Sequence, residues 1–229
     1  MKNWYQLTES ETLDKLGVTS EGLSSQQADS LLEKHGKNVL EESKKKSVFQ
    51  VFLSQFADLM VIILIIAAIV SMFSGSVEST IVIFAVITLN AILGTVQHVK
   101  AEKSLESLKS LSSPSAKVIR DGRKIEIDSE NIVPGDIVVL EAGDLVVADG
   151  RIINNYSLQV NESSLTGEST NIDKSVETIE KEVPLADRTD MVFSGSLVTY
   201  GRAIVVVTET GMNTEIGKIA TLMNQAKSK

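Results

Sequence analysis

The chain of 229 residues contains no cysteine, and this absence excludes disulfide bonds and thiolate metal sites. Its two histidines, His35 and His98, stand far apart in the sequence, which argues against a histidine-based transition-metal site. Basic residues are outnumbered, since 22 Lys and Arg against 30 Asp and Glu give a net charge of −8. We therefore expect no binding to nucleic acid.

The first residues lack the pattern of a secretory signal, which is a basic region followed by an apolar run. We therefore expect no cleaved signal peptide. Charge is nearly missing from residues 56–99, whereas most of the remaining chain is polar. This contrast divides the chain more clearly than its average composition does.

The charge-poor part contains two apolar runs, over residues 59–73 and 81–96, joined by a short turn at 74–76. With the apolar residues that lead into it, the first run reaches the roughly 20 residues that a membrane helix needs. Either run alone could be a buried helix of a soluble protein. Two such runs with a tight turn between them predict a transmembrane helical hairpin.

The lysines around this hairpin predict its orientation. Three lysines at 44–46 precede it and three more within 100–109 follow it, whereas the turn region carries only Glu78. Because positive residues stay on the cytoplasmic side, we expect both polar parts of the chain to face the cytoplasm. Apolar residues at helical spacing over 100–111 predict that the second helix continues as an amphipathic stalk.

Residues 1–40 are predicted to form small helices. The strings Thr8-Glu9-Ser10-Glu11 and Ser24-Ser25-Gln26-Gln27 both fit the capping box, with a hydroxyl first and Glu or Gln three residues later. Gly36 stands where the second helix is expected to end.

The region after the stalk is predicted to be a compact β domain, because short apolar runs alternate with turn signals. Asp121-Gly122, between two such runs, is the strongest signal for a β-hairpin. A helix is expected to begin at Thr214. Further strands are expected at 137–140, at 152–160, and at 192–200 and 203–208, the last two forming a hairpin around Gly201.

One polar loop within this domain holds the candidate catalytic group. Glu168 follows Gly167 directly, with the hydroxyls of Thr166 and Ser169 on either side. Glycine lets the backbone approach a ligand closely, and a carboxylate beside such a turn can orient or deprotonate a water. Acidic loops rich in Ser and Thr are usually only turns, so these residues alone leave both interpretations open.

Four strings in order decide between them, because together they resemble the P-type cation-transporting ATPases over essentially the whole chain. The N-terminal portion, over 22–38 and 55–59, is most similar to the calcium pumps of the sarcoplasmic-reticulum type. The four strings are Ile132-Val133-Pro134-Gly135-Asp136-Ile137-Val138, Ser164-Leu165-Thr166-Gly167-Glu168-Ser169, Val192-Phe193-Ser194-Gly195, and Thr210-Gly211-Met212-Asn213-Thr214-Glu215-Ile216-Gly217-Lys218-Ile219.

The resemblance implies an α+β membrane protein with N-terminal helices, one transmembrane helical hairpin and a cytoplasmic, β-rich actuator domain like a distorted jelly roll. It places the chain in a multi-pass membrane protein of a bacterial-type plasma membrane, with the lipid bilayer as a partner. The expected domains are an N-terminal segment at 1–47, the hairpin with its stalk at 48–111, the actuator domain at 112–219, and at 220–229 a stalk toward a third membrane helix.

The resemblance also implies roles for the loop residues. Glu168 would position and polarise the water that attacks an aspartyl phosphate, while Thr166, Gly167 and Ser169 would shape the loop around the phosphoryl group. Such water attack depends more on in-line placement than on a strong base. The whole pump would use ATP and Mg²⁺ and would export Ca²⁺ from the cytoplasm, and we expect no cofactor or metal site within this chain.

Three features depart from the family pattern. Val147 stands where a proline usually precedes Ala-Asp, and Asn161 stands where aspartate is frequent. The phosphorylated string Asp-Lys-Thr-Gly-Thr is missing, and the nearest string is Asp173-Lys174-Ser175. We therefore expect an amino-terminal part of a longer pump, inactive without the phosphorylation, nucleotide-binding and later membrane parts. A non-catalytic regulator of a complete pump, or a pump for sodium, potassium, protons or manganese, stays open.

Overall fold

The computed structural model describes residues 3–40, 47–111, 114–167 and 170–227. Contacts between Cα atoms divide the chain into two units, Met1–Glu41 with Ser113–Lys229, and Glu42–Ser112. Residues 1–41 therefore belong to the same unit as the β-rich part of the chain. The four-part division expected from the sequence stays a prediction.

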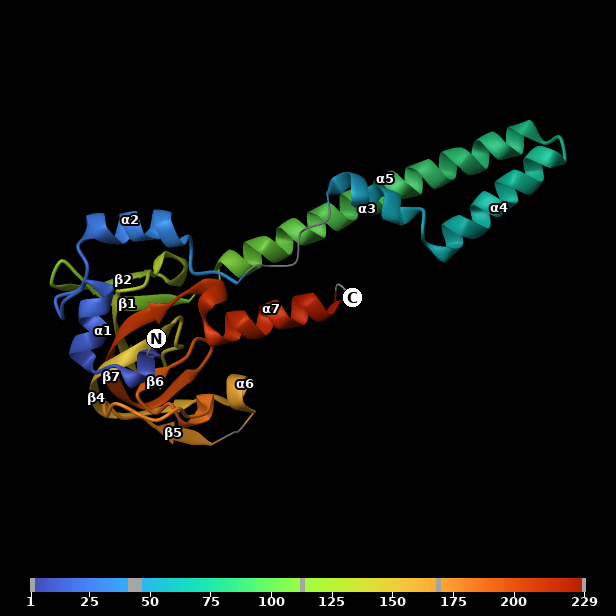
Figure 1. The fold of residues 1–229 in the computed structure, drawn as a ribbon. Helices are drawn as coiled ribbons and strands as arrows, with labels where there is room; N and C mark the ends of the chain where they lie inside the picture. Colours follow the sequence, from blue (N-terminus) through green and yellow to red (C-terminus); the bar gives the residue numbers. More distant parts are fainter. Residues whose placement is uncertain (1–2, 41–46, 112–113, 168–169, 228–229) are drawn as a thin grey trace. The chain divides into compact units, whose positions relative to one another are not determined.

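The first unit is built on one antiparallel seven-stranded sheet (Figure 1). The strand order is β2-β1-β3-β7-β4-β5, and β6 pairs with β4. Helices with an antiparallel sheet agree with the expected fold class, whereas the jelly-roll arrangement stays a prediction. The strands are β1 (Ser115–Arg120), β2 (Arg123–Asp128), β3 (Ile137–Glu141), β4 (Asp149–Asn161), β5 (Asn171–Asp173), β6 (Met191–Val192) and β7 (Leu197–Glu209).

The first two strands form the predicted hairpin. Arg120 pairs with Arg123 across the turn, in which Asp121 and Gly122 have φ of 51° and 68°. Positive φ at both central residues is the geometry that Asp-Gly favours. Arg120 also binds Asp136 through two hydrogen bonds of 2.8 and 2.7 Å, which fixes the turn before β3 to the hairpin.

The hairpin expected around Gly201 is wrong, because β7 runs through this glycine as one strand of 13 residues. Gly201 has φ of +74° and faces Ser157 of β4, whose own φ is +53°. A Cβ atom on Gly201 would lie 2.2 Å from the backbone oxygen of Ser157. The glycine therefore permits an irregularity where two strands approach closely, rather than a turn.

The helices of the first unit include the two predicted from capping boxes. In both, the side chain of the N-cap residue, Thr8 or Ser24, accepts a hydrogen bond from the backbone three residues later. Leu13 and Leu31 of these helices pack against a buried cluster that includes Ile137 and Val206 of the sheet. The helices are α1 (Glu9–Leu16), α2 (Ser25–His35), α6 (Ser163–Thr166) and α7 (Glu215–Lys227), with short 3-10 helices at Trp4–Gln6, Ser129–Asn131, Leu185–Asp187 and Gly211–Asn213.

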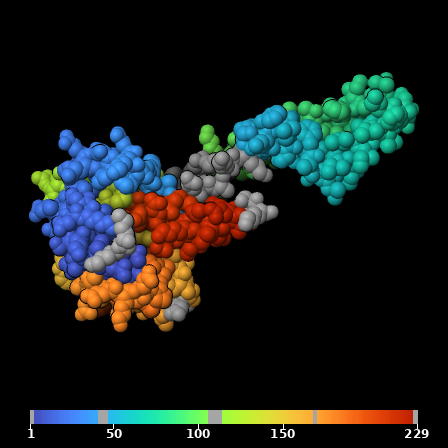
Figure 2. Space-filling model, viewed as in Figure 1, coloured from blue at the N-terminus to red at the C-terminus, as the bar shows by residue number. Residues whose placement is uncertain are grey.

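The N-terminal residues are attached to the segment before β6 (Figure 2). Tyr5 is buried beside Met191 and Phe193, and its carbonyl accepts a hydrogen bond of 3.2 Å from the backbone of Ile179. The guanidinium of Arg188 lies 4.6 Å from the centre of the Tyr5 ring. These contacts join the beginning of the chain to a part more than 150 residues later.

The second unit contains three helices, α3 (Val48–Gln55), α4 (Leu59–Phe73) and α5 (Val77–Leu111), of which α4 and α5 form the expected helical hairpin. The predicted stalk is the end of α5, which continues to Leu111. Of the described helices, α5 is long and apolar enough by itself to cross a membrane, over Val77–Leu105.

The first membrane run differs from its prediction. The apolar residues leading into it form the separate helix α3, which meets α4 at an angle of 62°. The break occurs because the side chain of Asp58 accepts a hydrogen bond of 2.9 Å from Met60 N–H and begins a new helix. The 15 residues of α4 span about 22 Å, against roughly 30 Å of bilayer core, so a full span requires both helices.

Candidate functional site

The candidate loop connects β4 with β5 and begins as a single helical turn. The carbonyl of Glu162 accepts hydrogen bonds from the backbone N–H groups of Leu165 and Thr166, at 2.9 and 3.0 Å. The hydroxyl of Thr166 donates to the same carbonyl at 3.1 Å. Gly167 then ends the turn in the left-handed conformation, with φ of 77°. The backbone geometry, rather than crowding, therefore requires glycine at this position.

Two further side chains fix this turn. Asn161 accepts hydrogen bonds through Oδ1 from the backbone N–H of Ser163 at 3.1 Å and from its hydroxyl at 2.6 Å. The hydroxyl of Ser164 donates to the carbonyl of Gly195 at 3.0 Å, which connects the turn with the loop before β7. An aspartate oxygen could accept the same two bonds as Asn161, so this departure from the family pattern preserves the local structure.

Two of the four predicted catalytic residues, Thr166 and Gly167, lie within the described residues. Thr166 is half-buried at the end of the helical turn, and Gly167 is exposed. Glu168 and Ser169 lie outside the described residues. The strand that follows pairs with β4, since Asn171 is the partner of Asn161. The described residues thus place the two ends of the loop on adjacent strands.

A buried ion pair lies at the base of this loop. Nζ of Lys174 is 2.5 Å from Oε1 of Glu162, and both side chains have no exposed surface. Burial raises the pKa of Glu162 and lowers that of Lys174, while the opposite charge of each partner acts against these shifts. Among the described residues, neither charged group has another hydrogen-bond partner, so each depends on the other.

A second buried pair extends this charged cluster. Nε of Arg151 is 3.1 Å from Oδ2 of Asp190, and both side chains are fully buried. Burial raises the pKa of Asp190 to about 6 despite the charge of Arg151. Arg151 also donates hydrogen bonds to the carbonyls of Leu7 and Val176, so it connects β4 with the N-terminal segment and the chain after β5.

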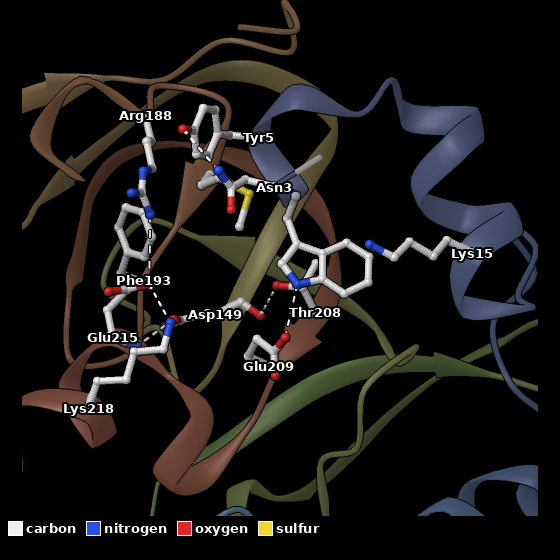
Figure 3. Close-up of a pocket in the computed structure, with 12 residues that line it drawn as sticks. Asn3, Tyr5, Lys15, Asp149, Arg188, Phe193, Thr208, Glu209, Glu215 and Lys218 are labelled. Atoms are coloured by element: carbon white, nitrogen blue, oxygen red, sulfur yellow. Dashed lines mark hydrogen bonds and ion pairs between the residues drawn. The ribbon is translucent and has the colours of Figure 1, made fainter. Parts of the chain in front are cut away.

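A polar cavity of about 220 Å³ lies elsewhere in the same unit, beside the beginning of α7 (Figure 3). The indole N–H of Trp4 donates a hydrogen bond of 2.9 Å to Glu209 in its wall. Asp149 also lines this cavity, and burial raises its pKa to about 6. Its carboxylate accepts backbone hydrogen bonds from Ser194 and Glu215, both at 2.8 Å. The described charges of this cavity therefore serve internal contacts.

The described residues contain no group of three or more His, Asp or Glu side chains close enough to hold a metal ion.

Comparison with known proteins places this arrangement in a family. Residues 110–224 match the sequence model of the P-type ATPase actuator domain, which covers the whole sheet, the loop and most of α7. This chain belongs to the P-type ATPases. Residues 4–71 match a second model, described as the N-terminus of cation transporters and ATPases.

Individual relatives extend the match over nearly the whole chain. A calcium-transporting ATPase of Listeria monocytogenes is 48% identical over 225 residues, which are 98% of this chain and 26% of the relative. Calcium-transporting ATPase 1 of Bacillus cereus is 44% identical over 233 residues, again 26% of its length. A cation-transporting ATPase of Synechocystis is 40% identical over 213 residues, 93% of this chain and 23% of the relative. The chain thus spans about a quarter of the length of these P-type ATPases.

The buried charges of this actuator domain are not recognisable in the sequence. In the sequence, Lys174 stands out only as part of the string nearest to the missing phosphorylation motif, and Glu162 does not stand out. Lys and Glu are rarely fully buried unless they are paired, and the partner of each is set by the pairing of β4 with β5. A single sequence offers no local signal for such a pair.

Proposed function

We propose that this chain is the amino-terminal part of an ATP-driven P-type cation pump that exports calcium from the cytoplasm. In this proposal, loop 166–169 acts in the hydrolysis of an aspartyl phosphate formed on another part of the same pump. The oxygen of a water attacks phosphorus while the bond from phosphorus to the aspartyl oxygen breaks. Inorganic phosphate leaves, the aspartate is regenerated, and Glu168 orients the water and receives its proton.

The observation that carries this proposal is the loop's place in the described fold. Its helical turn begins directly after β4, and its second end returns along β4 as β5. Among the described residues, no atom lies within 4 Å of the Cβ position of Gly167. An exposed turn on a fixed base suits a group that must meet a phosphoryl group in line, because placement supplies much of the rate in phosphoryl transfer.

Calcium is proposed as the transported ion because two relatives, 48% and 44% identical, are named calcium-transporting ATPases. The proposal assigns ATP and Mg²⁺ to parts of the pump outside this chain. It places the α4–α5 hairpin in a bacterial plasma membrane, with residues 1–47 and 112–219 on the cytoplasmic side. The chain alone is expected to be inactive, because it lacks the Asp-Lys-Thr-Gly-Thr string.

The test uses the full-length pump that carries this segment. In the variant Glu168→Gln, the phosphoenzyme should form from ATP but decay at least about 100-fold more slowly, the scale of a lost general base. The exposed residue Glu177 provides a matched control, since Glu177→Gln removes a nearby charge without touching the loop. Normal phosphoenzyme decay in Glu168→Gln would refute the assigned role.

The assignment as part of a pump has its own test. The purified 229-residue chain, assayed with ATP and calcium, should show no turnover above background. Reproducible turnover that persists through further purification would contradict the proposal that phosphorylation occurs on another part of the pump.

A further inference from the structure

We infer that the buried ion pair of Glu162 and Lys174 is a positioning pair, which holds the helical turn Ser163–Thr166 in a fixed orientation on the sheet. The two groups lie at the two ends of the candidate loop. Glu162 directly precedes the turn, and Lys174 directly follows β5. Their contact of 2.5 Å therefore closes the loop at its base.

The backbone of Glu162 transmits this contact to the turn. Its carbonyl accepts the hydrogen bonds from Leu165 and Thr166, while its side chain is held by Lys174. The backbone N–H of Lys174 in turn donates to the carbonyl of Leu158 in β4, at 2.9 Å. Rotation of the turn about its attachment to β4 would therefore require the buried side chain of Glu162 to move.

The surroundings of Lys174 restrict the pair further. Nζ lies 5.6 Å from the centre of the Phe193 ring, and the charge of Asp190 also acts on it. The charged end of Lys174 thus lies near the two residues that flank β6. Because Asp190 is paired with Arg151, the position of Lys174 is coupled to a second buried pair.

Stability alone does not explain these charges. Removing two opposite charges from water costs much of the energy that their attraction returns, and an apolar pair of similar size is often equally stable. The interaction of a charged, hydrogen-bonded pair is directional, whereas apolar packing is not. The charged pair therefore favours one arrangement of its two side chains. We therefore expect that replacing both charged side chains by apolar ones changes the stability little but removes the fixed orientation of the turn.

The first test needs only this chain, purified in detergent. Hydrogen exchange at Leu165, Thr166 and Gly167 reports on the turn, because their N–H groups bond to the carbonyls of Glu162 and Ser163. The double variant Glu162→Met with Lys174→Met replaces the ion pair by an apolar pair of similar size. It should exchange at least about tenfold faster there, while exchange in β3 and β7 stays unchanged. Equal protection of the turn in this variant and the native chain would overturn the inference.

The second test rests on the proposed function and uses the full-length pump. Lys174→Met leaves the buried carboxylate of Glu162 without its partner. The melting temperature should therefore fall and the phosphoenzyme should decay more slowly. The double variant should recover the melting temperature of the native pump. Its phosphoenzyme should still decay roughly 10- to 100-fold more slowly, since small misplacements of a catalytic group have effects of that size. A merely structural pair would recover both properties together, and this result would also overturn the inference.

Two controls separate the possible failures. Arg120→Met breaks a different, largely buried pair, with Asp136, at the hairpin of β1 and β2. This variant should lower stability without slowing the decay of the phosphoenzyme relative to its formation. Glu168→Gln tests the proposed function in the same assay. If the phosphoenzyme decays slowly in Glu168→Gln but at the normal rate in the double variant, only the positioning role is wrong. If Glu168→Gln decays normally, the proposed function fails, whereas the exchange experiment still decides the positioning role.

Discussion

The carboxylate of Asp149 accepts a hydrogen bond of 2.8 Å from the backbone N–H of Glu215, the first residue of α7. Its other oxygen accepts a bond of 2.8 Å from the backbone of Ser194, in the turn after β6. A negative charge at the N-terminus of a helix also interacts favourably with the helix dipole. One buried side chain therefore holds α7 and a surface turn to the first residue of β4.

This arrangement predicts a dependence of stability on pH. Burial raises the pKa of Asp149 from 3.8 to about 6, so the folded chain binds this proton more tightly than the unfolded chain does. The resulting stability is fully present below about pH 3.8 and is lost as the pH rises through about 6. The difference between the two pKa values corresponds to roughly 3 kcal/mol in the free energy of unfolding.

The variant Asp149→Asn should flatten this dependence between pH 4 and 7, as measured by denaturant unfolding. Part of the slope should remain, because the pKa of Asp190 is also raised to about 6 by burial. Asp128→Asn, at an exposed position, should leave the slope unchanged. A slope in Asp149→Asn equal to that of the native chain would show that this carboxyl is not the titrating group.

Gly201 is expected to be one of the least replaceable residues of the sheet. In Gly201→Ala, the new Cβ would meet the carbonyl of Ser157 at 2.2 Å, and a residue other than glycine would be strained at φ of +74°. We expect a loss of about 2–4 kcal/mol in the free energy of unfolding.

Gly143→Ala provides the control for this prediction. Gly143 has φ of +95°, but among the described residues no atom lies within 4 Å of its Cβ position. It should therefore show only the conformational cost, about 1–2 kcal/mol. If urea unfolding shows equal losses of unfolding free energy in the two variants, the close approach of β4 and β7 adds nothing to the cost of Gly201→Ala.

Tyr5 is expected to anchor the N-terminal segment to the sheet. Its side chain is 2% exposed and packs with Met191 and Phe193 under the guanidinium of Arg188. Tyr5→Ala should lower the free energy of unfolding by about 3–5 kcal/mol, as the truncation of a large aromatic side chain in a core does. Residues 4–16 should then become accessible to limited proteolysis. Tyr200→Ala removes a tyrosine that is 61% exposed, and its digestion pattern should match that of the native chain.

The absence of cysteine allows a direct test of the proposed membrane orientation. Ser76→Cys, in the turn between α4 and α5, should react in intact cells with a thiol reagent that cannot cross membranes. Arg123→Cys, at the start of β2, should react only after the cells are permeabilised. The reverse pattern would invert the proposed topology, and labelling of both positions in intact cells would contradict the membrane span.

Features set by neighbouring residues were predictable from the sequence. The capping boxes at Thr8 and Ser24, the Asp121-Gly122 hairpin and the helix after Thr214 all occur as expected. Each depends on hydrogen bonds or backbone angles within a few residues. The hydroxyl of Thr214, for example, accepts a bond from Gly217 N–H at 3.1 Å.

Features set by distant strands were not predictable. A glycine at position 201 is typical of a turn, but the structure places Gly201 inside a continuous strand, where it approaches Ser157 of β4 closely. The bend before α4 depends on Asp58, whose side chain caps the helix at a position where the sequence shows an unbroken apolar segment around one charge. Similarly, the burial of Lys174 follows from strand pairing that no short window contains.

The first unit is interrupted in sequence, because residues 1–41 belong to it and the 71 residues Glu42–Ser112 do not. During synthesis, α1 and α2 emerge well before β3, β4 and β7, whose apolar side chains they cover. Leu13, Leu16 and Leu31 must therefore remain without their partners while the helical hairpin is made. The ribosome thus completes this domain late, and a chain stopped after α5 would expose an apolar surface that chaperones recognise.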